Sequence, residues 1–328
     1  MIRILQILIT KFLPLWIICC AYIGYQFPEW FTGIKNWTSF SLAFILFIMG
    51  LTLSRDSLRR IMKNPKNAII GVIGKWIVTT GISLLLASLF FSHQNDLKAG
   101  VILAGSVPSG TSANLYSMMA NGNVALSVMM SSLDTFIGPF FTPVIMKSAV
   151  GSVVNIAITP LVLKMVYVVL LPISLGLLIQ WKFHEKIISI RSIIPVLSSI
   201  ALLIIDLSVV SNAHDMLHDN LNQLPKLFLC VFLQIIIPMI LGYLYSALFK
   251  MPEAERRSIV YEFGICNTAL AALLAMVSIS PIAAVPAVTN MIVNTSLGAL
   301  IAIVWEPAIT KWKNLTNNHG KNKLKLNS

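Results

Sequence analysis

Long apolar stretches, separated by short polar segments, run through almost the whole chain. Ten of them have about the 20 residues that an α-helix needs to cross the hydrocarbon core of a bilayer. Their approximate ranges are 10–27, 37–54, 66–91, 98–120, 123–147, 158–181, 192–211, 224–249, 254–279 and 282–310. The pattern predicts an all-α polytopic membrane protein with ten transmembrane helices.

The composition agrees with a bilayer as the solvent. Of the 328 residues, 57% are hydrophobic and only 11% are charged, whereas a soluble domain carries roughly 25% charged residues. No soluble core could bury this much apolar sequence, so we expect lipid around most of the chain.

The basic residues predict the orientation. The formal net charge is +12, and with a cytoplasmic N-terminus 18 of the 24 Lys and Arg fall on the cytoplasmic side. Only Lys35, Lys98, Lys147 and Lys226 fall outside. Cytoplasmic loops of membrane proteins carry such an excess. We therefore expect both termini, including a basic tail at 311–328, in the cytoplasm, with the chain in a bacterial inner membrane or a plasma membrane and no nucleic-acid partner.

Two of the predicted spans are interrupted. The fourth contains Ser106-Val-Pro-Ser-Gly-Thr-Ser-Ala-Asn114, and the ninth contains Glu262-Phe-Gly-Ile-Cys-Asn267. Non-helical backbone at membrane depth is tolerated only where protein or a wet cavity satisfies its polar groups. Secondary transporters build substrate and ion sites from such broken helices, so the two breaks favour a carrier.

The ten spans divide into two halves of five. An odd number of spans inverts the second half, so we expect an inverted repeat of 1–150 and 151–310 within one transmembrane unit, 1–310. The interrupted span is the fourth of each half, which would place Asn114 and Asn267 at matching positions just past each break.

Three motifs resemble the bile acid:sodium symporter family. They are Pro108-Ser-Gly-Thr-Ser-Ala-Asn-Leu, then Gly122-Asn-Val-Ala-Leu-Ser127 with Gly138-Pro-Phe-Phe-Thr-Pro143, and Glu262-Phe-Gly-Ile-Cys-Asn-Thr. The resemblance covers essentially the whole chain. It implies a panel domain (10–54 and 158–211) and a core domain (66–147 and 224–310), with broken helices four and nine crossing in the core.

The resemblance also implies a sodium site at Asn114, Ser127, Ser131 and Glu262. A carboxylate at mid-membrane depth is costly and normally faces a partner or an ion, which makes Glu262 the leading candidate. A protonated Glu262 that only hydrogen-bonds the broken helix is the plainer alternative. Ser127 and Ser131 share a helical face, although small hydroxyl residues often serve helix packing alone. Ala113 stands where the family commonly has a serine.

A second family sodium site is predicted to be lost. Lys75 and Cys266 occupy the places of its two glutamines, and a lysine ammonium could supply the missing positive charge. We expect Lys75 to pair with Glu262 or Asp134. A buried lysine can also load and release a proton, so proton coupling and a static ion pair both remain open. Asp206, in the seventh span, has no assigned role.

The predicted function is secondary active transport of small organic anions, namely bile acid-like, keto or hydroxy acids, by alternating access. We expect coupling to one sodium ion; the alternative is a proton-coupled or cation-independent carrier in which Lys75 replaces the second sodium. Thr111, Ser112 and Asn267 flank the breaks, where helix N-termini favour an anion. The sequence has no His-Glu-x-x-His or Gly-x-Ser-x-Gly motif, so an enzyme is not expected. Arsenite efflux and a non-transporting sensor are weaker alternatives.

Overall fold

The structure is a computed structural model of the chain. It describes residues 9, 12–34, 37–52, 65–151, 158–183, 185–187, 193–212, 214–219 and 221–326. Part of the basic sequence behind the predicted orientation, including 1–8 and 53–64, lies outside these residues. In the described part the regular secondary structure is helical throughout, with one isolated β-bridge between Ser109 and Cys266. The all-α prediction is confirmed.

The helices follow the predicted apolar stretches, and both interrupted spans are divided into two helices. In chain order they are α2 (Leu13–Gln26), η1 (Pro28–Ile34), α3 (Trp37–Thr52), α5 (Lys66–Phe90), α6 (Asn95–Ala104), α7 (Thr111–Met119), α8 (Val124–Val150), α9 (Ile158–Met165), η2 (Val166–Leu170), α10 (Leu171–Lys182), α12 (Ile194–Asn212), α13 (His214–Asp219), η3 (Leu221–Gln223), α14 (Leu224–Leu248), α15 (Glu253–Gly264), α16 (Thr268–Ser278) and α17 (Pro281–Leu326).

Four helices of the described part are long and apolar enough to cross a membrane: α5, α8, α14, and α17 as far as Trp305. The 25 residues of α5 span about 37 Å at 1.5 Å per residue, more than the ~30 Å hydrocarbon core. Shorter apolar helices, including α2, α3, α12 and α16, occupy other predicted spans. The chain is thus a helical, multi-pass membrane protein, while the count of ten spans and the inverted repeat stay predictions.

Helices α2, α3, α10 and α12 form one group, in which α3 packs on α10 and α12, and α12 packs on α2. Two glycines bring α3 and α10 together. A Cβ at Gly50 would lie 2.2 Å from the Ile173 carbonyl oxygen, and one at Gly176 would lie 2.1 Å from that of Phe47. Small residues at helix contacts permit this approach.

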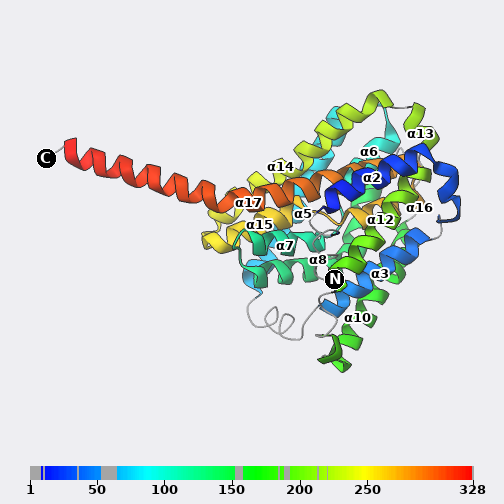
Figure 1. The fold of residues 1–328 in the computed structure, drawn as a ribbon, viewed down its shortest axis with the longest axis horizontal. Helices are drawn as coiled ribbons and strands as arrows, with labels where there is room; N and C mark the ends of the chain where they lie inside the picture. Colours follow the sequence, from blue (N-terminus) through cyan, green and yellow to red (C-terminus); the bar gives the residue numbers. More distant parts are fainter. Residues whose placement is uncertain are drawn as a thin grey trace.

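The other group surrounds the broken helices. Helix α14 packs on α5 and α15, α17 packs on α6 and α16, and α8 packs on α5 and α7. The groups meet where α16 contacts α3 and α12 and where α17 contacts α2 and α12. Figure 1 shows α17 running along the bundle and its C-terminal part extending beyond it.

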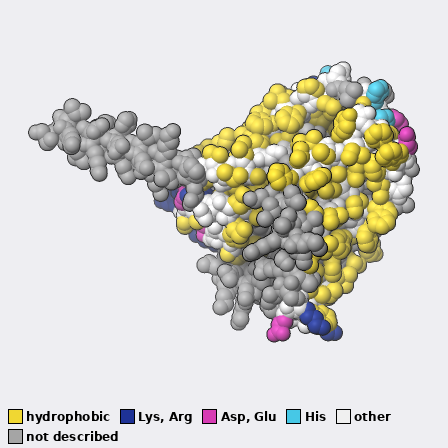
Figure 2. All heavy atoms as spheres, viewed as in Figure 1, with side chains coloured by type: hydrophobic (Ala, Val, Ile, Leu, Met, Phe, Trp, Pro, Cys, Tyr) yellow, Lys and Arg dark blue, Asp and Glu magenta, His cyan; other side chains and the backbone are white. Residues whose placement is uncertain are grey.

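The outer surface is largely apolar. In Figure 2 hydrophobic side chains cover most of the visible described surface, and the charged and histidine side chains gather near its ends. Helix α5 has one outward-facing side and one side that faces the protein interior. The exposed side carries Ile69, Ile73 and Ile77, and the opposite, buried side carries Lys75 and Thr79. A helix in a bilayer can expose such residues without cost because lipid is as apolar as they are.

Candidate cation site at the crossing of two helix breaks

The two unwound segments satisfy each other's backbone. The Gly110 N–H donates to the Ile265 carbonyl at 2.9 Å, and the Asn267 N–H donates to the Pro108 carbonyl at 2.8 Å. These bonds flank the bridge between Ser109 and Cys266. Within a bilayer unpaired backbone groups cost several kcal/mol each, so the breaks are stable because they cross.

One face of α8 lies along the first break. Ser127, Ser131, Asp134, Gly138 and Thr142 follow one another at intervals of three or four residues, which places them on one side of the helix. The Thr142 hydroxyl donates to the Ser106 carbonyl at 2.6 Å. A Cβ at Gly138 would lie 2.4 Å from Cγ of Pro108, so only glycine admits this contact. Helix α8 thereby fixes the position of the break.

The four residues of the predicted sodium site lie together. Glu262, at the end of α15, is fully buried. Its Oε1 lies 2.5 Å from the Ser127 Oγ and 2.9 Å from the Ser131 Oγ. Asn114, in the first turn of α7, places its Oδ1 2.8 Å from the Ser127 Oγ and 3.3 Å from the Ser131 Oγ. Side chains from α7, α8 and α15 therefore converge on one point.

This cluster has more oxygen lone pairs than hydrogens. The two serine hydroxyls carry one hydrogen each, yet five oxygen–oxygen pairs lie within hydrogen-bond distance. Among the described residues no Lys, Arg or His forms an ion pair with Glu262. Hard cations prefer oxygen ligands of this kind, so the donor set fits a sodium ion.

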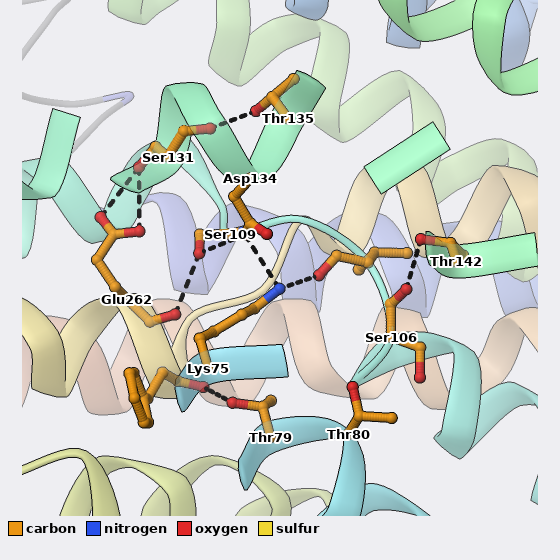
Figure 3. Close-up of polar contacts among 12 residues, drawn as sticks. Lys75, Thr79, Thr80, Ser106, Ser109, Ser131, Asp134, Thr135, Thr142 and Glu262 are labelled. Carbon is orange, nitrogen blue, oxygen red and sulfur yellow. Dashed lines mark hydrogen bonds and ion pairs between the residues drawn. The ribbon is translucent and has the colours of Figure 1, made fainter. Parts of the chain in front are cut away.

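Lys75 lies beside this cluster and pairs with Asp134, one of its two predicted partners. Both side chains are 1% exposed, and Nζ lies 3.0 Å from Asp134 Oδ2. The ammonium also donates to the Val107 carbonyl at 2.5 Å and lies 4.3 Å from the centroid of the Trp76 ring. Asp134 Oδ2 accepts from the Ser109 N–H at 2.6 Å and from its hydroxyl at 2.9 Å. Figure 3 shows Lys75 and Asp134 meeting at the break.

The residues predicted near an anion occupy different settings. Thr111, the first residue of α7, is exposed, and Ser112 is half-buried. The N-cap of α7 is Gly110, whose lack of a side chain leaves no capping oxygen there. Asn267, by contrast, is the N-cap of α16, and its Oδ1 accepts from the Leu270 N–H at 3.1 Å.

Asn114 and Asn267 therefore do not occupy matching positions just past the two breaks, as we had expected. Asn114 lies inside the first turn of α7 and contacts the serines of α8, whereas Asn267 precedes α16 and caps it. Cys266 is buried, and its carbonyl accepts from the Asn294 side-chain amide at 3.4 Å.

Several polar residues of the site were not foreseen. Ser109 links the two breaks, because its hydroxyl also lies 3.1 Å from the Glu262 carbonyl. Gln234, Asn290 and Asn294, all buried, form a chain of side-chain amides between α14 and α17. These three amides could have been noticed in the sequence, because an uncharged amide in an apolar span is costly unless it has a hydrogen-bond partner.

Asp206 is apart from this site, on α12. It is fully buried, and neither carboxyl oxygen has a hydrogen-bond partner among the described residues. In the described part of the chain, no hydrogen bond or ion pair joins it to Glu262, Ser127 or Ser131.

Comparisons with known proteins agree with this architecture. Residues 39–221 match the model of the sodium bile acid symporter family. An uncharacterized sodium-dependent transporter of Bacillus subtilis (strain 168), YocS, is 31% identical over 299 residues, covering 90% of this chain and 91% of that protein.

Two chloroplast proteins, each described as a probable sodium/metabolite cotransporter, are also similar. BASS2 of Oryza sativa subsp. japonica is 30% identical over 92% of this chain and 72% of its own length. BASS1 of Arabidopsis thaliana is 27% identical over 91% of this chain and 74% of its own length.

Broken helices that cross inside a membrane bundle beside a cluster of polar oxygens are typical of secondary transporters. The chain belongs to the sodium bile acid symporter family. It is a transport protein and not an enzyme.

Proposed function

We propose that this protein is a sodium-coupled carrier of small organic anions that binds one sodium ion at Asn114, Ser127, Ser131 and Glu262. The observation that carries the proposal is the fully buried Glu262 carboxylate, held within hydrogen-bond distance of two serine hydroxyls whose hydrogens are too few for the surrounding oxygens. A bound cation supplies the missing positive charge. The names of the relatives, a sodium-dependent transporter and sodium/metabolite cotransporters, support sodium as that cation.

Alternating access would come from movement between two helix groups. We propose that α2, α3, α10 and α12 form the panel and that the helices around the breaks form the core, within one unit spanning 1–310. The division is supported by the packing, which is more extensive within each group than between the two groups. Both termini, with the tail at 311–328, are placed in the cytoplasm of a bacterial inner membrane or plasma membrane.

The anion is placed at the N-termini of α7 and α16. Helix N-termini carry about half a positive charge each and present free N–H groups. Thr111 and Ser112 can donate to a carboxylate at the first, where Gly110 leaves the helix end without a side-chain cap. At the second, the amide nitrogen of Asn267 remains available because capping uses its oxygen. Bile acid-like, keto and hydroxy acids are the proposed substrate class.

The second family sodium site is proposed to be absent. Lys75 replaces one of its ligands and Cys266 the other, and a thiol is a poor ligand for a hard cation. The ion pair of Lys75 with Asp134 supports a fixed positive charge here. The same pair also supports the alternative, a proton-coupled or cation-independent carrier.

The test is thermal unfolding of the purified full chain in sodium and in potassium at matched ionic strength. At 100 times its dissociation constant, a ligand specific for the folded state adds about 2.7 kcal/mol of stability. We expect this gain in the wild type and its loss in Glu262→Gln. Ser132→Ala is the matched control, because Ser132 neighbours Ser131 but its hydroxyl bonds only the Val128 carbonyl of its own helix.

A wild type that gains nothing from sodium contradicts sodium coupling. If its stability then varies with pH, and Lys75→Gln removes that variation, the proton-coupled alternative is correct. Uptake of a panel of keto and hydroxy acids into proteoliposomes, with and without an inward sodium gradient, tests the substrate class.

A further inference from the structure

Asp206 differs from the other two buried acidic side chains of the described chain, Asp134 and Glu262. All three are at most 1% exposed. Asp134 pairs with Lys75 and accepts hydrogen bonds from Ser109, and Glu262 lies within hydrogen-bond distance of two serine hydroxyls. Neither oxygen of the Asp206 carboxyl has a hydrogen-bond partner among the described residues. The fold therefore supplies donors to two buried carboxyl groups and none to the third.

Asp206 lies at the seam between α12 and α2. A Cβ at Gly24 of α2 would lie 3.3 Å from the Leu207 carbonyl oxygen of α12, so the two helices approach closely at this level. One turn earlier on α2 is Cys20, whose thiol lies close enough to the Asp206 carboxyl for an electrostatic interaction. The carboxyl is thus enclosed in a closely packed seam, away from water and lipid.

The helices around Asp206 offer it no counter-charge within the part of the chain that the structure describes. Helices α3, α16, and α17 as far as Trp305 pack on α12 or beside it and have no ionisable side chain. Glu29 of η1 is acidic and exposed. The other ionisable side chains of α2 cannot carry a positive charge; they are Cys19, Tyr22 and Tyr25. Those of α13 lie beyond the end of α12 and form no ion pair with Asp206; they include His214, Asp215 and His218.

This environment favours a proton over a metal ion as the ligand of Asp206. An ionised carboxylate that is buried without a partner costs so much free energy that the group is neutralised instead. A hard cation needs several oxygen ligands, and the neighbouring thiol of Cys20 is a poor ligand for such an ion. A proton requires neither a cavity nor a set of further ligands.

We propose that Asp206 is a proton-binding site, separate from the cation cluster at Glu262, and that its carboxyl group is neutral in this conformation. The carboxyl can release the proton only where water reaches the seam, that is, when α2 and α12 move apart. Because α12 also packs on α16 and α17, such a movement changes the contact between the two helix groups. The protein thereby responds to pH through Asp206, whichever cation drives transport.

The experiment compares infrared spectra of the purified full chain and of Asp206→Asn at neutral pH, because protonated and ionised carboxyl groups absorb at different frequencies. The variant is expected to lose one protonated carboxyl group. Asp215→Asn is the matched control: this side chain is fully exposed, and its replacement should remove a carboxylate. If Asp206→Asn also removes a carboxylate, the proposal is wrong. Asparagine resembles the neutral acid, so a variant that no longer folds would show that the fold requires the charge, which also overturns the proposal.

The pH dependence of thermal unfolding provides an independent measurement. An unfolded aspartate is ionised above about pH 4, whereas the folded protein keeps the proton. The free energy of unfolding therefore falls as the pH rises, by about a factor of ten in the folding equilibrium for each pH unit, until the folded protein also releases the proton. Asp206→Asn should remove this contribution and show a shallower decline, and equal slopes would overturn the proposal. Both measurements are made without sodium, so a failure of the proposed site at Glu262 leaves them unaffected.

Discussion

Replacing Gly138 by alanine tests whether α8 fixes the first break. The added Cβ would lie 2.4 Å from Cγ and 3.0 Å from Cδ of Pro108, whereas carbon atoms in contact sit about 3.5–4.0 Å apart. The proline ring is part of the backbone and cannot rotate away. The break must therefore move by about 1 Å, or α8 must.

The size of the effect follows from that geometry. Overpacking of a tight interior site destabilises by roughly 1–3 kcal/mol. Alanine also removes backbone freedom from the unfolded chain, which contributes about 0.4–1 kcal/mol in the opposite direction. Because the Pro108 carbonyl accepts the Asn267 N–H, a displaced break also shifts the crossing, and sodium should bind more weakly.

The matched control is Gly81→Ala in α5. Gly81 is exposed, and a Cβ there would have no heavy atom within 4 Å. It should therefore raise stability by the amount expected for Gly→Ala in a helix, about 0.5–1 kcal/mol. Thermal unfolding and radioactive-sodium binding are measured for both variants. If Gly138→Ala matches Gly81→Ala in both measurements, α8 does not hold the break.

Three further changes have defined outcomes. In sodium-free choline, removing either partner of the Lys75–Asp134 pair should lower the free energy of unfolding by about 3–5 kcal/mol. Replacing both, Lys75 by Gln and Asp134 by Asn, should lower it much less. If the losses in thermal unfolding are additive, the two side chains are not coupled. Asn267→Ala should cost about 1 kcal/mol through loss of the α16 cap and Asn267→Ser should recover most of it, with equal unfolding temperatures contradicting the capping role. Gly176→Val should block the contact with Phe47 and lower the yield of folded protein in size-exclusion chromatography; a normal elution profile would mean that α3 and α10 can separate.

Much of the fold could be predicted because a bilayer leaves few choices. Apolar stretches of about 20 residues must be helices there, and a Pro-Ser-Gly run within one must be a break that protein satisfies. Glu262 could be singled out because a carboxylate at membrane depth is costly unless it faces a partner or an ion. Its neighbours Ser127 and Ser131 followed from their spacing together with the family motif.

The partner of Lys75 could not be settled in the same way. Hydropathy gives the length of a helix but not its rotation, so Asp134 and Glu262 were equally available. Ser109 gave no signal of its own, because a serine in a break looks like any other turn residue. The chain from Gln234 to Asn294 depends on contacts between α14 and α17, which no local pattern contains. The different settings of Asn114 and Asn267 likewise depend on where each helix begins, a boundary that sequence defines poorly.

The bonds between the two breaks also bear on how the protein is made. The Pro108 carbonyl and the Gly110 N–H have their partners on Asn267 and Ile265, which emerge from the ribosome only when most of the chain has been synthesised. Until then the first break has unpaired backbone groups that lipid cannot satisfy. The core around the first break can therefore finish folding only after the second half of the chain has been synthesised. Half-chains expressed alone should be degraded, and co-expression of both halves should restore them.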